Sequence, residues 1–503
     1  MTEDSNPAEV LRLAGRTVMF AAVIAAAVFA FAALAASDGS DATGGNVTDT
    51  ITWDITGDTL TISGTGAIPD YLQMPGSTAP WRYTNEVRHV TVSDGITRIG
   101  NQCFLGNYWV ESFTLGKDVT SVGERAFEQC GNVTAMTIHC VNLQEIGTGA
   151  IDDLTKISTL EMSEGVHYVP AIAMCSTELA TVTIPASATD IAAYAFDGAE
   201  KLSHVVFKPL AMDRPTESRV FPMFAHFTVE FAQGITIIPA YLFDQCFGLT
   251  SVTIPATVTE IQSHAFSDCG IKSAVIPDSV KTIGSYAFAL CSSMETLTIG
   301  KSVESIGYSA FDRCIKLKEI TIPASVTHIS GNCFFETRDL TEFNFYPTVN
   351  TGDVDSEFGK MDYTPVGFQA YFGPGSVIPK GFMNDADCKM LIFDGKSIEP
   401  LAFNRFSGIG LERIVFGSNI ESISADSFEH YVFKDADGNV IELTPDNVKD
   451  KTFVSTDTRS FVLETYTIPE DSDSEDQKNI AIALAIVIAV IAAGMVIAFA
   501  RKH

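Results

Sequence analysis

Basic residues are scarce in this sequence. Its 503 residues include 32 lysines and arginines against 62 aspartates and glutamates, which gives a formal net charge of -30. A surface of this sign repels nucleic acids and anionic membrane surfaces, because both are themselves negatively charged. We therefore expect no nucleic-acid partner.

The short motifs of common enzymes are missing as well. The sequence contains no HExxH zinc motif, no GxSxG nucleophile elbow and no GxxxxGK[ST] phosphate loop. Its nine histidines are scattered singly, and no CxxC pair indicates a zinc site. We predict no catalytic residue, no cofactor and no metal site.

Long apolar runs, by contrast, are present near both ends of the chain. Thr17–Ala36 and Ile480–Ala500 contain no charged residue, and each is long enough to cross a bilayer as a helix. Arginines precede the first run, and Arg501-Lys502-His503 follows the second. Because basic residues stay on the cytoplasmic side, both ends are predicted to be cytoplasmic and the region between the runs extracellular. The small-x-small site Ala33-Leu34-Ala35 leaves open whether the first run is a cleaved signal peptide or a retained anchor.

A segment of roughly 23 residues recurs along most of the chain. One copy reads LTSVTIPATVTEIQSHAFSDC, and the phenylalanines Phe243, Phe266 and Phe288 occupy the same place in successive copies. One copy cannot bury its apolar residues alone, whereas stacked copies can, so the repeat predicts a solenoid. The alternating, β-branched VTIP stretch predicts one strand per turn. Stacked strands then form a parallel sheet, and the rest of each copy returns with its Ala-Phe pair inward.

The combined motif LxxVTIP, VxxI and AFxxC, from Leu249 to Cys269, resembles the repeats of BspA-like leucine-rich-repeat proteins. The resemblance covers about residues 87–430 and implies a leucine-rich-repeat solenoid. Upstream, ITWDITGDTLTISGTGAIPDY and APW look like the module that commonly precedes such repeats. VFKDADGNVIEL and KTFV, residues 432–443 and 451–454, look like a β-rich terminal module of related surface proteins.

The predicted fold class is a repeat solenoid of the leucine-rich-repeat type. It has a parallel β-sheet on one face, short turns or 3-10 segments on the other, β-rich caps and two transmembrane helices. The predicted organisation is a cytoplasmic leader (1–16), a signal peptide or anchor (17–36), an N-terminal β cap module (46–86), the solenoid (87–430), a C-terminal β-rich module (431–468), an acidic stalk (469–479), a transmembrane helix (480–500) and a cytoplasmic tail (501–503).

Half of the ten cysteines share one position, three residues after the repeated phenylalanine: Cys130, Cys246, Cys269, Cys291 and Cys314. We interpret them as a structural ladder of small buried residues. Neighbouring thiols in such a ladder could approach disulfide distance, so an oxidised pair such as Cys269–Cys291 is one alternative and a metal site is another.

The outward side chain in the middle of each strand is usually threonine: Thr91, Thr114, Thr137, Thr183, Thr253, Thr298 and Thr321. This column is a candidate binding surface, although threonine also suits any exposed strand. Asn46 and Asn132 each begin an N-x-T triplet and are candidate N-glycosylation sites. The stretch DADGN, residues 435–439, is interpreted as a hairpin turn. A calcium loop would need a glutamate at its twelfth position, where Asp446 stands.

Extended solenoid faces are binding surfaces, and a broad shallow face suits proteins or glycans better than small metabolites. The resemblance implies a surface protein of the kind that attaches host-associated microbes to host matrix proteins or other cells. We therefore predict a membrane-anchored recognition or adhesion protein of the cell surface. Its predicted partners are extracellular proteins or glycans, and Ile480–Ala500 would hold it in the membrane. The alternative is a structural component of the cell envelope without a specific ligand. An enzyme or a sensor is the least favoured class.

Overall fold

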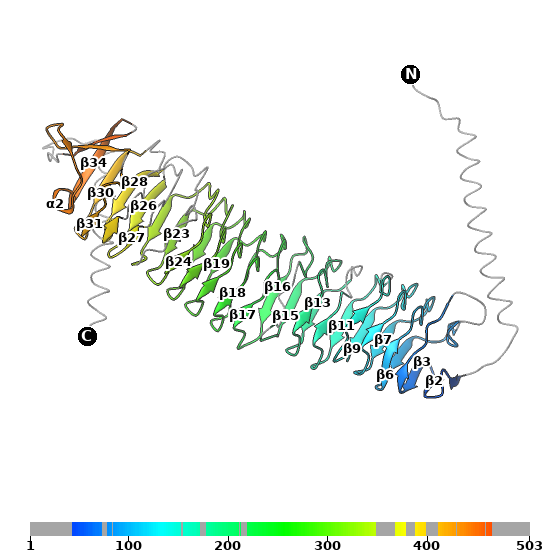
Figure 1. Ribbon diagram of the computed structural model, residues 1–503. Helices are drawn as coiled ribbons and strands as arrows, with labels where there is room; N and C mark the ends of the chain where they lie inside the picture. The colour runs from blue at the N-terminus through cyan, green and yellow to red at the C-terminus, as the bar shows by residue number, and fades with distance from the viewer. Residues whose placement is uncertain are drawn as a thin grey trace, which may run out of the picture.

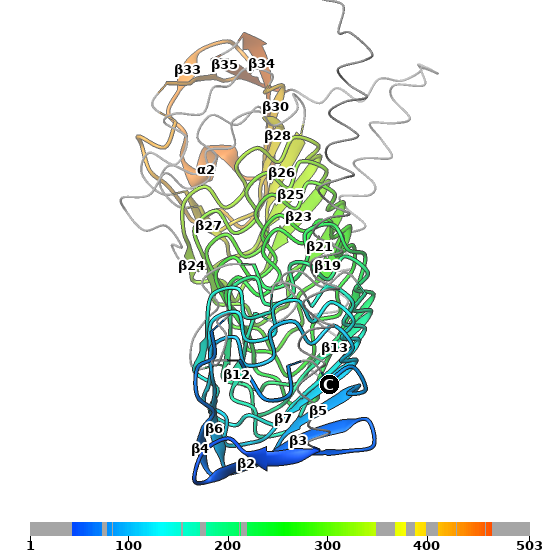
Figure 2. The same cartoon turned by 90° about the vertical axis from the view of Figure 1, so that its right-hand side faces the viewer.

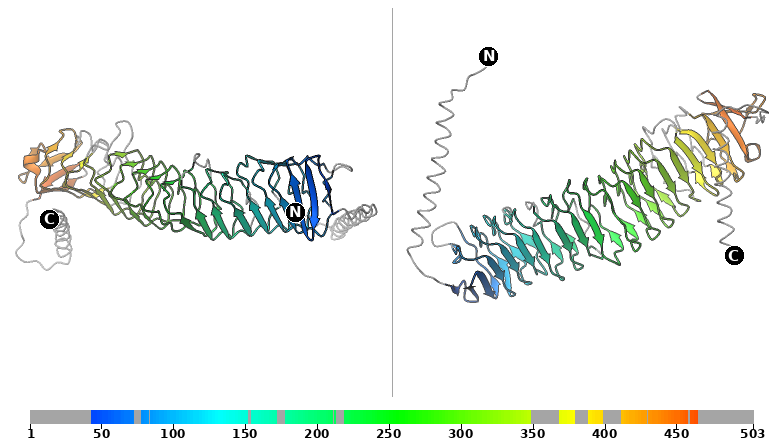
Figure 3. Two further views of the ribbon diagram at one scale, coloured as in Figure 1. Left: turned by 90° about the horizontal axis from the view of Figure 1, so that it is seen from below. Right: turned by 180° about the vertical axis from the view of Figure 1, so that it is seen from behind.

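The computed structural model describes residues 43–464, apart from 73–77, 83, 152–153, 172–177, 211, 213–218, 349–367, 379–387, 399–410, 429 and 458. The described residues form an elongated rod of stacked coils (Figure 1). Two columns of short parallel strands follow the length of the rod, and turns connect them. Further views of the rod show the same stacking from the β2 end to the β34 end (Figure 3).

The first column contains the strands expected from the VTIP-like stretches. They are β5 (His89–Val92), β7 (Ser112–Leu115), β9 (Ala135–Ile138), β11 (Thr159–Met162), β13 (Thr181–Ile184), β15 (His204–Phe207), β16 (Thr228–Phe231), β19 (Ser273–Val275), β21 (Thr296–Thr298), β23 (Glu319–Ile322), β25 (Glu342–Phe345), β26 (Phe368–Phe372), β28 (Cys388–Phe393) and β30 (Arg413–Phe416). Burial alternates along them, as in β9, where Met136 and Ile138 are buried and Ala135 and Thr137 are not. Successive side chains of a strand point to opposite faces, so every second residue enters the core.

A second column of strands lies where the sequence predicted only turns or 3-10 segments. Its members are β4 (Gly66–Ala67), β6 (Ile96–Ile99), β8 (Ser121–Val122), β10 (Glu145–Ile146), β12 (Tyr168–Val169), β14 (Asp190–Ile191), β17 (Ile237–Ile238), β18 (Glu260–Ile261), β20 (Thr282–Ile283), β22 (Ser305–Ile306), β24 (His328–Ile329), β27 (Val377–Ile378), β29 (Ser397–Ile398) and β31 (Ser422–Ile423). Figure 2 shows the two columns on different sides of the coils, with β24 and β27 opposite β23 and β26. Most of these strands have two residues, too few to show an alternating pattern in the sequence.

The first column is not one continuous sheet. Its strands form four sheets, with the orders β1-β2-β3-β5-β7-β9-β11, β13-β15-β16, β19-β21 and β23-β25-β26-β28-β30-β34-β35-β32-β33. Between β16 and β19, residues 251–254 occupy the strand position without ladder bonding. The coils remain stacked across the first and the last of these breaks, because β11 contacts β13 and β21 contacts β23.

A stack of aromatic rings fills the interior of the rod. Phe196, Phe221, Phe243, Phe266, Phe288, Phe311 and Phe334 stack one on the next, with ring centroids 5.1–5.7 Å apart and planes within 18° of parallel. Phe221 fills the long interval between Phe196 and Phe243 that the sequence left without a repeat phenylalanine. None of the seven is more than 1% exposed, so the stack forms a continuous core.

The turns hold ordinary residues in left-handed backbone conformations. Fourteen residues that lie two places before or after a repeat phenylalanine have φ between 52° and 61°: Gln102, Arg125, Gln129, Tyr194, Tyr241, Gln245, His264, Asp268, Tyr286, Leu290, Ser309, Arg313, Asn332 and Glu336. Such a conformation costs roughly 1–2 kcal/mol per residue. Hydrogen bonds to the next coil offset that cost, since the N–H groups of His264 and Asp268 donate to carbonyls one coil ahead at 3.0 and 2.7 Å.

At the N-terminal end, β1 (Gly44–Asn46), β2 (Ile51–Thr56) and β3 (Thr59–Gly64) extend the first sheet. β1, β2 and β3 pair antiparallel, and β3 then pairs parallel to β5. Trp81 stands one repeat length before Phe104 and takes the position of a repeat phenylalanine, with its ring 5.9 Å from Phe104. Trp53 packs edge-on against it at 6.2 Å. The two indoles thus cover the open end of the core.

At the C-terminal end, β34 (Lys451–Asp457) pairs antiparallel to β30 and closes the first column. β35 (Ser460–Leu463), β32 (Val432–Lys434) and β33 (Val440–Ile441) continue this sheet, and the short helix α2 (Pro445–Val448) precedes β34. Phe453 of β34 meets Phe416 of β30 edge-on at 5.8 Å. An antiparallel strand therefore ends the parallel stack.

The fold class expected from the sequence is corrected in one respect. It included two transmembrane helices, but no helix among the described residues is long and apolar enough to cross a membrane. Residues 1–36 and 469–503, which contain both apolar runs, lie outside the described part of the chain. Hydropathy measures the length and polarity of a segment and does not establish its conformation. The described fold is a β-solenoid of stacked coils.

Candidate functional site

The threonine column lies on the outer face of the first strand column. Thr91, Thr114 and Thr137 are directly paired in register across β5, β7 and β9. Thr61 of β3 joins them on the cap side, a position that the repeat pattern missed because β3 precedes the first repeat. Four threonines therefore stand side by side at the N-terminal end of the sheet.

The remaining predicted threonines are not paired with one another within a sheet. Thr183, Thr298 and Thr321 occupy the same strand position in three other sheets, and their paired neighbours are Val206, Val275 and Asn344. Thr253 lies outside any strand, and its side chain is exposed. The column is thus threonine-rich at one end and mixed along the rest of the rod.

A second outward column, two residues earlier in each strand, carries hydrogen-bonded side chains. His89 Nδ1 lies 2.8 Å from Ser112 Oγ, and His204 Nδ1 lies 3.0 Å from Thr228 Oγ1. Further along, Thr296 Oγ1 donates to Ser273 Oγ at 2.9 Å. These bonds join neighbouring coils. The two histidines stand singly in the sequence, but a hydroxyl residue follows each of them one repeat later, and this spacing is the signal for the contact.

The five ladder cysteines are buried, and each thiol reaches a backbone carbonyl of the preceding coil. The acceptors of Cys130, Cys246, Cys269, Cys291 and Cys314 are the carbonyls of Phe104, Phe221, Phe243, Phe266 and Phe288, at 3.1–3.9 Å. The structure records all five as free thiols. Burial raises the pKa of the Cys291 thiol to about 12, which keeps it protonated and unreactive at neutral pH.

The two sequon asparagines have different surroundings. Asn46 is exposed at the end of β1. Asn132 is exposed too, but its amide is engaged: Nδ2 donates to the carbonyl of Tyr108 at 2.7 Å, and Oδ1 accepts from Lys156 Nζ at 2.7 Å. A glycan attached at Asn132 would be linked to Nδ2. It would therefore either break the hydrogen bond from Nδ2 to the Tyr108 carbonyl or share this nitrogen with it.

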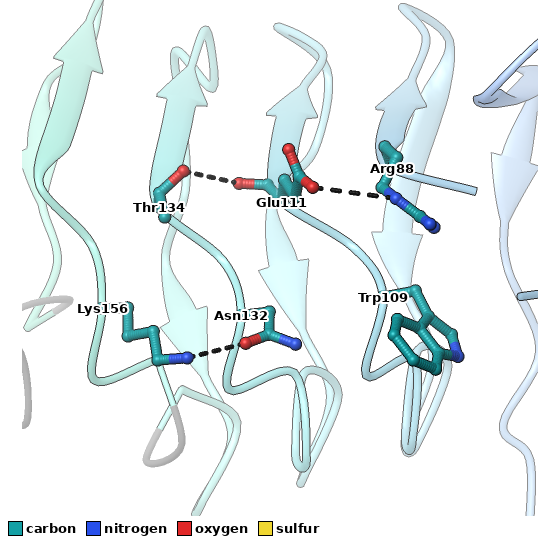
Figure 4. A pocket seen from close by; sticks show the side chains of 6 residues that line it. All are labelled: Arg88, Trp109, Glu111, Asn132, Thr134 and Lys156. Carbon is teal, nitrogen blue, oxygen red and sulfur yellow. Dashed lines mark hydrogen bonds and ion pairs between the residues drawn. The ribbon is translucent and has the colours of Figure 1, made fainter. Parts of the chain in front are cut away.

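Asn132 also lines a hollow of about 370 Å³ near the N-terminal end of the rod (Figure 4). The lining residues are Arg88, Trp109, Glu111, Asn132, Thr134 and Lys156. They come from four successive coils and fall into two columns. Arg88, Glu111 and Thr134 immediately precede β5, β7 and β9, whereas the other three stand three residues before β7, β9 and β11.

Several contacts fix the side chains of the hollow. The Trp109 indole N–H donates to Asn85 Oδ1 at 3.1 Å, and the guanidinium carbon of Arg88 lies 5.7 Å from the centre of the indole ring. Arg88 Nε lies 3.7 Å from Glu111 Oε1. Sequence reasoning missed this hollow. Its signal was the regular interval of one repeat length from Trp109 to Asn132 and again from Asn132 to Lys156.

No group of histidine, cysteine, aspartate or glutamate side chains within the described ranges could hold a metal ion. In the DADGN stretch, Asp435 Oδ1 accepts the backbone N–H groups of Asp437 and Asn439 at 3.0 and 2.8 Å. Gly438 has φ +85°, as a tight turn between β32 and β33 requires. The stretch is a hairpin turn whose first carboxylate is occupied by its own backbone.

Buried carboxylates lie beside the stacked phenylalanines. Desolvation raises the pKa of Asp244, and it raises the pKa of Asp312 to about 6. His264 stacks between Tyr241 and Tyr286, at 4.6 and 4.7 Å, and burial lowers its pKa. These groups belong to the turns and do not converge on the hollow.

The repeats define the class of this solenoid. The family model described as the BspA type leucine rich repeat region matches residues 80–203 and 236–355 in six copies. The resemblance inferred from the sequence is confirmed, and the repeats of this chain belong to that family. Proteins with such repeats are usually found at the cell surface and are in general binding scaffolds involved in protein interaction or adhesion, and no catalytic family is indicated. No curated protein sequence matches the chain.

Several solved structures are similar in fold. A leucine-rich repeat protein from Bacteroides ovatus is 18% identical, with 78% of this chain and 94% of that chain covered and a TM-score of 0.40. One from Eubacterium ventriosum is 20% identical, with 73% and 94% covered and a TM-score of 0.32. The pneumococcal vaccine antigen PcpA is 16% identical, with 75% and 97% covered and a TM-score of 0.30. At these TM-scores the similarity carries no further argument.

Proposed function

We propose that this protein is a recognition and adhesion protein of the cell surface that binds extracellular proteins or glycans through the outer surface of its solenoid. The observation that carries the proposal is the exposed polar face of the first strand column. Thr253, Thr298 and Thr321 are exposed there, and hydrogen-bonded histidine, serine and threonine side chains stand beside this column. A long, polar and rigid face offers many weak contacts to a large partner.

We propose further that the protein is not an enzyme. A catalytic site needs side chains that converge at hydrogen-bond distance from a reacting atom. The cysteine ladder supplies thiols that are buried and protonated, and the described residues bring together no metal-binding group. Binding remains the activity that the surface supports.

The test is a binding screen of the full chain against immobilised matrix proteins, mucins and whole cells. Saturable binding to one class supports the proposal. Thr114→Lys and Thr321→Lys then test the sheet face, because a long cation in the middle of a flat surface blocks close approach. We expect each to weaken binding to a ligand held on the face.

Matched controls lie in the same coils. Thr120→Lys and Thr327→Lys add the same charge six residues later, beside the second strand column. If both members of each pair weaken binding equally, the effect is electrostatic and the sheet face is not the site. If the folded chain binds nothing in the panel, the adhesion proposal fails.

One observation favours the alternative of a structural component that packs beside copies of itself. Phe224 and Phe247 stack on the surface 5.7 Å apart, and they are 73% and 38% exposed. Large exposed apolar patches mark contact surfaces, and this pair of rings would lie within such a surface. Light scattering measures the oligomeric state of the chain and of Phe224→Ser. An assembly that the substitution dissociates supports the structural function, and a monomer at high concentration rules it out.

A further inference from the structure

We propose that the hollow formed by Arg88, Trp109, Glu111, Asn132, Thr134 and Lys156 binds a pyranose ring of a glycan. This inference rests on the proposed recognition function and gives one part of the surface a ligand class. It depends on three features of the hollow: an exposed and fixed indole, the presence of both hydrogen-bond donors and acceptors, and a shape built by four successive coils.

The indole of Trp109 is unlike the other two in the chain. Trp53 and Trp81 are 7% and 0% exposed and close the end of the core, whereas Trp109 is 50% exposed. Leaving so large an apolar ring in water forfeits burial that the other two tryptophans obtain. Its N–H bond to Asn85 and the nearby Arg88 guanidinium hold the ring in one orientation. A fixed, exposed aromatic face suits the apolar C–H face of a pyranose.

The polar groups around the indole include both donors and acceptors. Arg88 and Lys156 donate, the Glu111 carboxylate accepts, and Asn132 and Thr134 can do both. A sugar hydroxyl donates one hydrogen bond and accepts others, so a ring of hydroxyls needs this mixture. A site for a phosphate or a sulfate would gain nothing from Glu111, which lies within the same hollow and 3.7 Å from Arg88.

The hollow also has room for a small ligand. Its volume of about 370 Å³ lies near the lower end of the usual range for ligand pockets. Figure 4 shows Trp109 below Arg88 at one side, and Asn132 and Lys156 beside it. Farther along the rod, the same column has an ion pair between Lys201 and Glu178 at 2.6 Å, where the hollow has the 2.7 Å hydrogen bond between Lys156 and Asn132.

Glycosylation of Asn132 itself is the rival occupant. The sequon places a carbohydrate on the atom that donates to the Tyr108 carbonyl, at the wall of the hollow. The experiment therefore uses full-length chain from a host without N-glycosylation, with its mass measured. If the native protein carries a glycan at Asn132 that occupies the hollow, the proposal of an external ligand is overturned.

The probes are the methyl pyranosides of glucose, galactose, mannose and N-acetylglucosamine, with methyl glucuronide as an acidic member. Binding is followed by tryptophan fluorescence and by saturation-transfer NMR. We expect a saturable signal with at least one probe, and a loss in affinity of about tenfold or more in Trp109→Ala. Lys156→Glu is expected to weaken binding too, without removing the indole.

Tyr108→Ala is the matched control. Tyr108 is 53% exposed and precedes Trp109 in the chain, but its side chain does not line the hollow and its hydroxyl donates to Gln129. Its substitution is expected to leave affinity unchanged. Absence of binding by every probe, or binding that persists in Trp109→Ala, overturns the inference. If the chain then still binds immobilised proteins in the screen above, the recognition function stands and only the sugar site fails.

Discussion

The carboxylate of Asp312 is largely shielded from water. The residue is 8% exposed, and Oδ1 has no hydrogen-bond partner among the described residues. Desolvation raises its pKa from 3.8 to about 6; Arg313, whose Nη1 lies 4.0 Å from Oδ2, opposes the shift, and Glu336 adds to it. A raised pKa means that the folded chain binds this proton more tightly than the unfolded chain. The stabilisation from the protonated form is full below about pH 4 and is lost as the pH rises through about 6.

We expect Asp312→Asn to remove this dependence. The rise in the pKa of Asp312 corresponds to a ceiling of ~3 kcal/mol, and the side chain retains 12% exposure. The substitution should therefore stabilise the chain by about 1–3 kcal/mol above pH 7, and the gain should vanish near pH 4. Asparagine preserves the shape and adds a donor near the unpaired oxygen position, so the fold should persist.

Hydrogen exchange of the full chain measures this effect locally, because coils of a solenoid open in groups. Peptides from the coils next to Asp312 are compared between the two proteins at the same pH, so that intrinsic exchange rates cancel. We expect protection to increase by about fivefold to 150-fold at pH 7.5 and to be equal at pH 4. Glu295→Gln, an exposed carboxylate in the same repeat copy, removes the same charge and should change nothing. Equal protection at every pH, or a gain that does not depend on pH, would refute the reasoning.

Two further predictions concern the core. Phe266→Ala should cost about 3–5 kcal/mol, because Phe266 is fully buried and stacks on Phe243 and Phe288, and urea unfolding measures the loss. Phe224→Ala, which removes the same group from a ring that is 73% exposed, should cost far less, and equal costs would contradict a core built on the stack. Cys291, with a pKa of about 12 and no exposure, should resist iodoacetamide at pH 8 until the chain is unfolded in urea; peptide mass spectrometry would show any labelling of the native protein.

The repeat made the core predictable from the sequence. The same apolar positions recur in each copy, so a pattern that is too short to predict structure from one copy is supported by the others. The alternation around Met136 and Ile138 and the recurring phenylalanines therefore identified strands and interior side chains. Phe221 was missed because the segment around it departs from the motif. Only the stacking of its ring between Phe196 and Phe243 identifies its position.

The turns and the second strand column could not be predicted in the same way. Gln102 and His264 have no glycine-like signal, yet they adopt positive φ because their N–H groups meet carbonyls of the next coil. That compensation exists only after the coils have stacked. The hollow depends on stacking too, since Trp109 and Lys156 are distant in the chain and line one hollow only because two repeat lengths separate them. The sequence contains the columns, but their contacts depend on the register between coils.

The same register explains how so acidic a rod tolerates its charge. Stacking brings residues one repeat apart into contact, so identical acids in one column would repel along the rod. Lysines stand beside acids in these columns instead. In the pairs Lys117–Asp94, Lys201–Glu178 and Lys281–Glu304, Nζ lies 3.1, 2.6 and 2.7 Å from a carboxylate oxygen, and each pair spans one repeat length. Exposed pairs of this kind contribute little to stability, so their role is to relieve repulsion between coils. The stability of the rod comes from the buried stack, and its charge remains on the exposed surface.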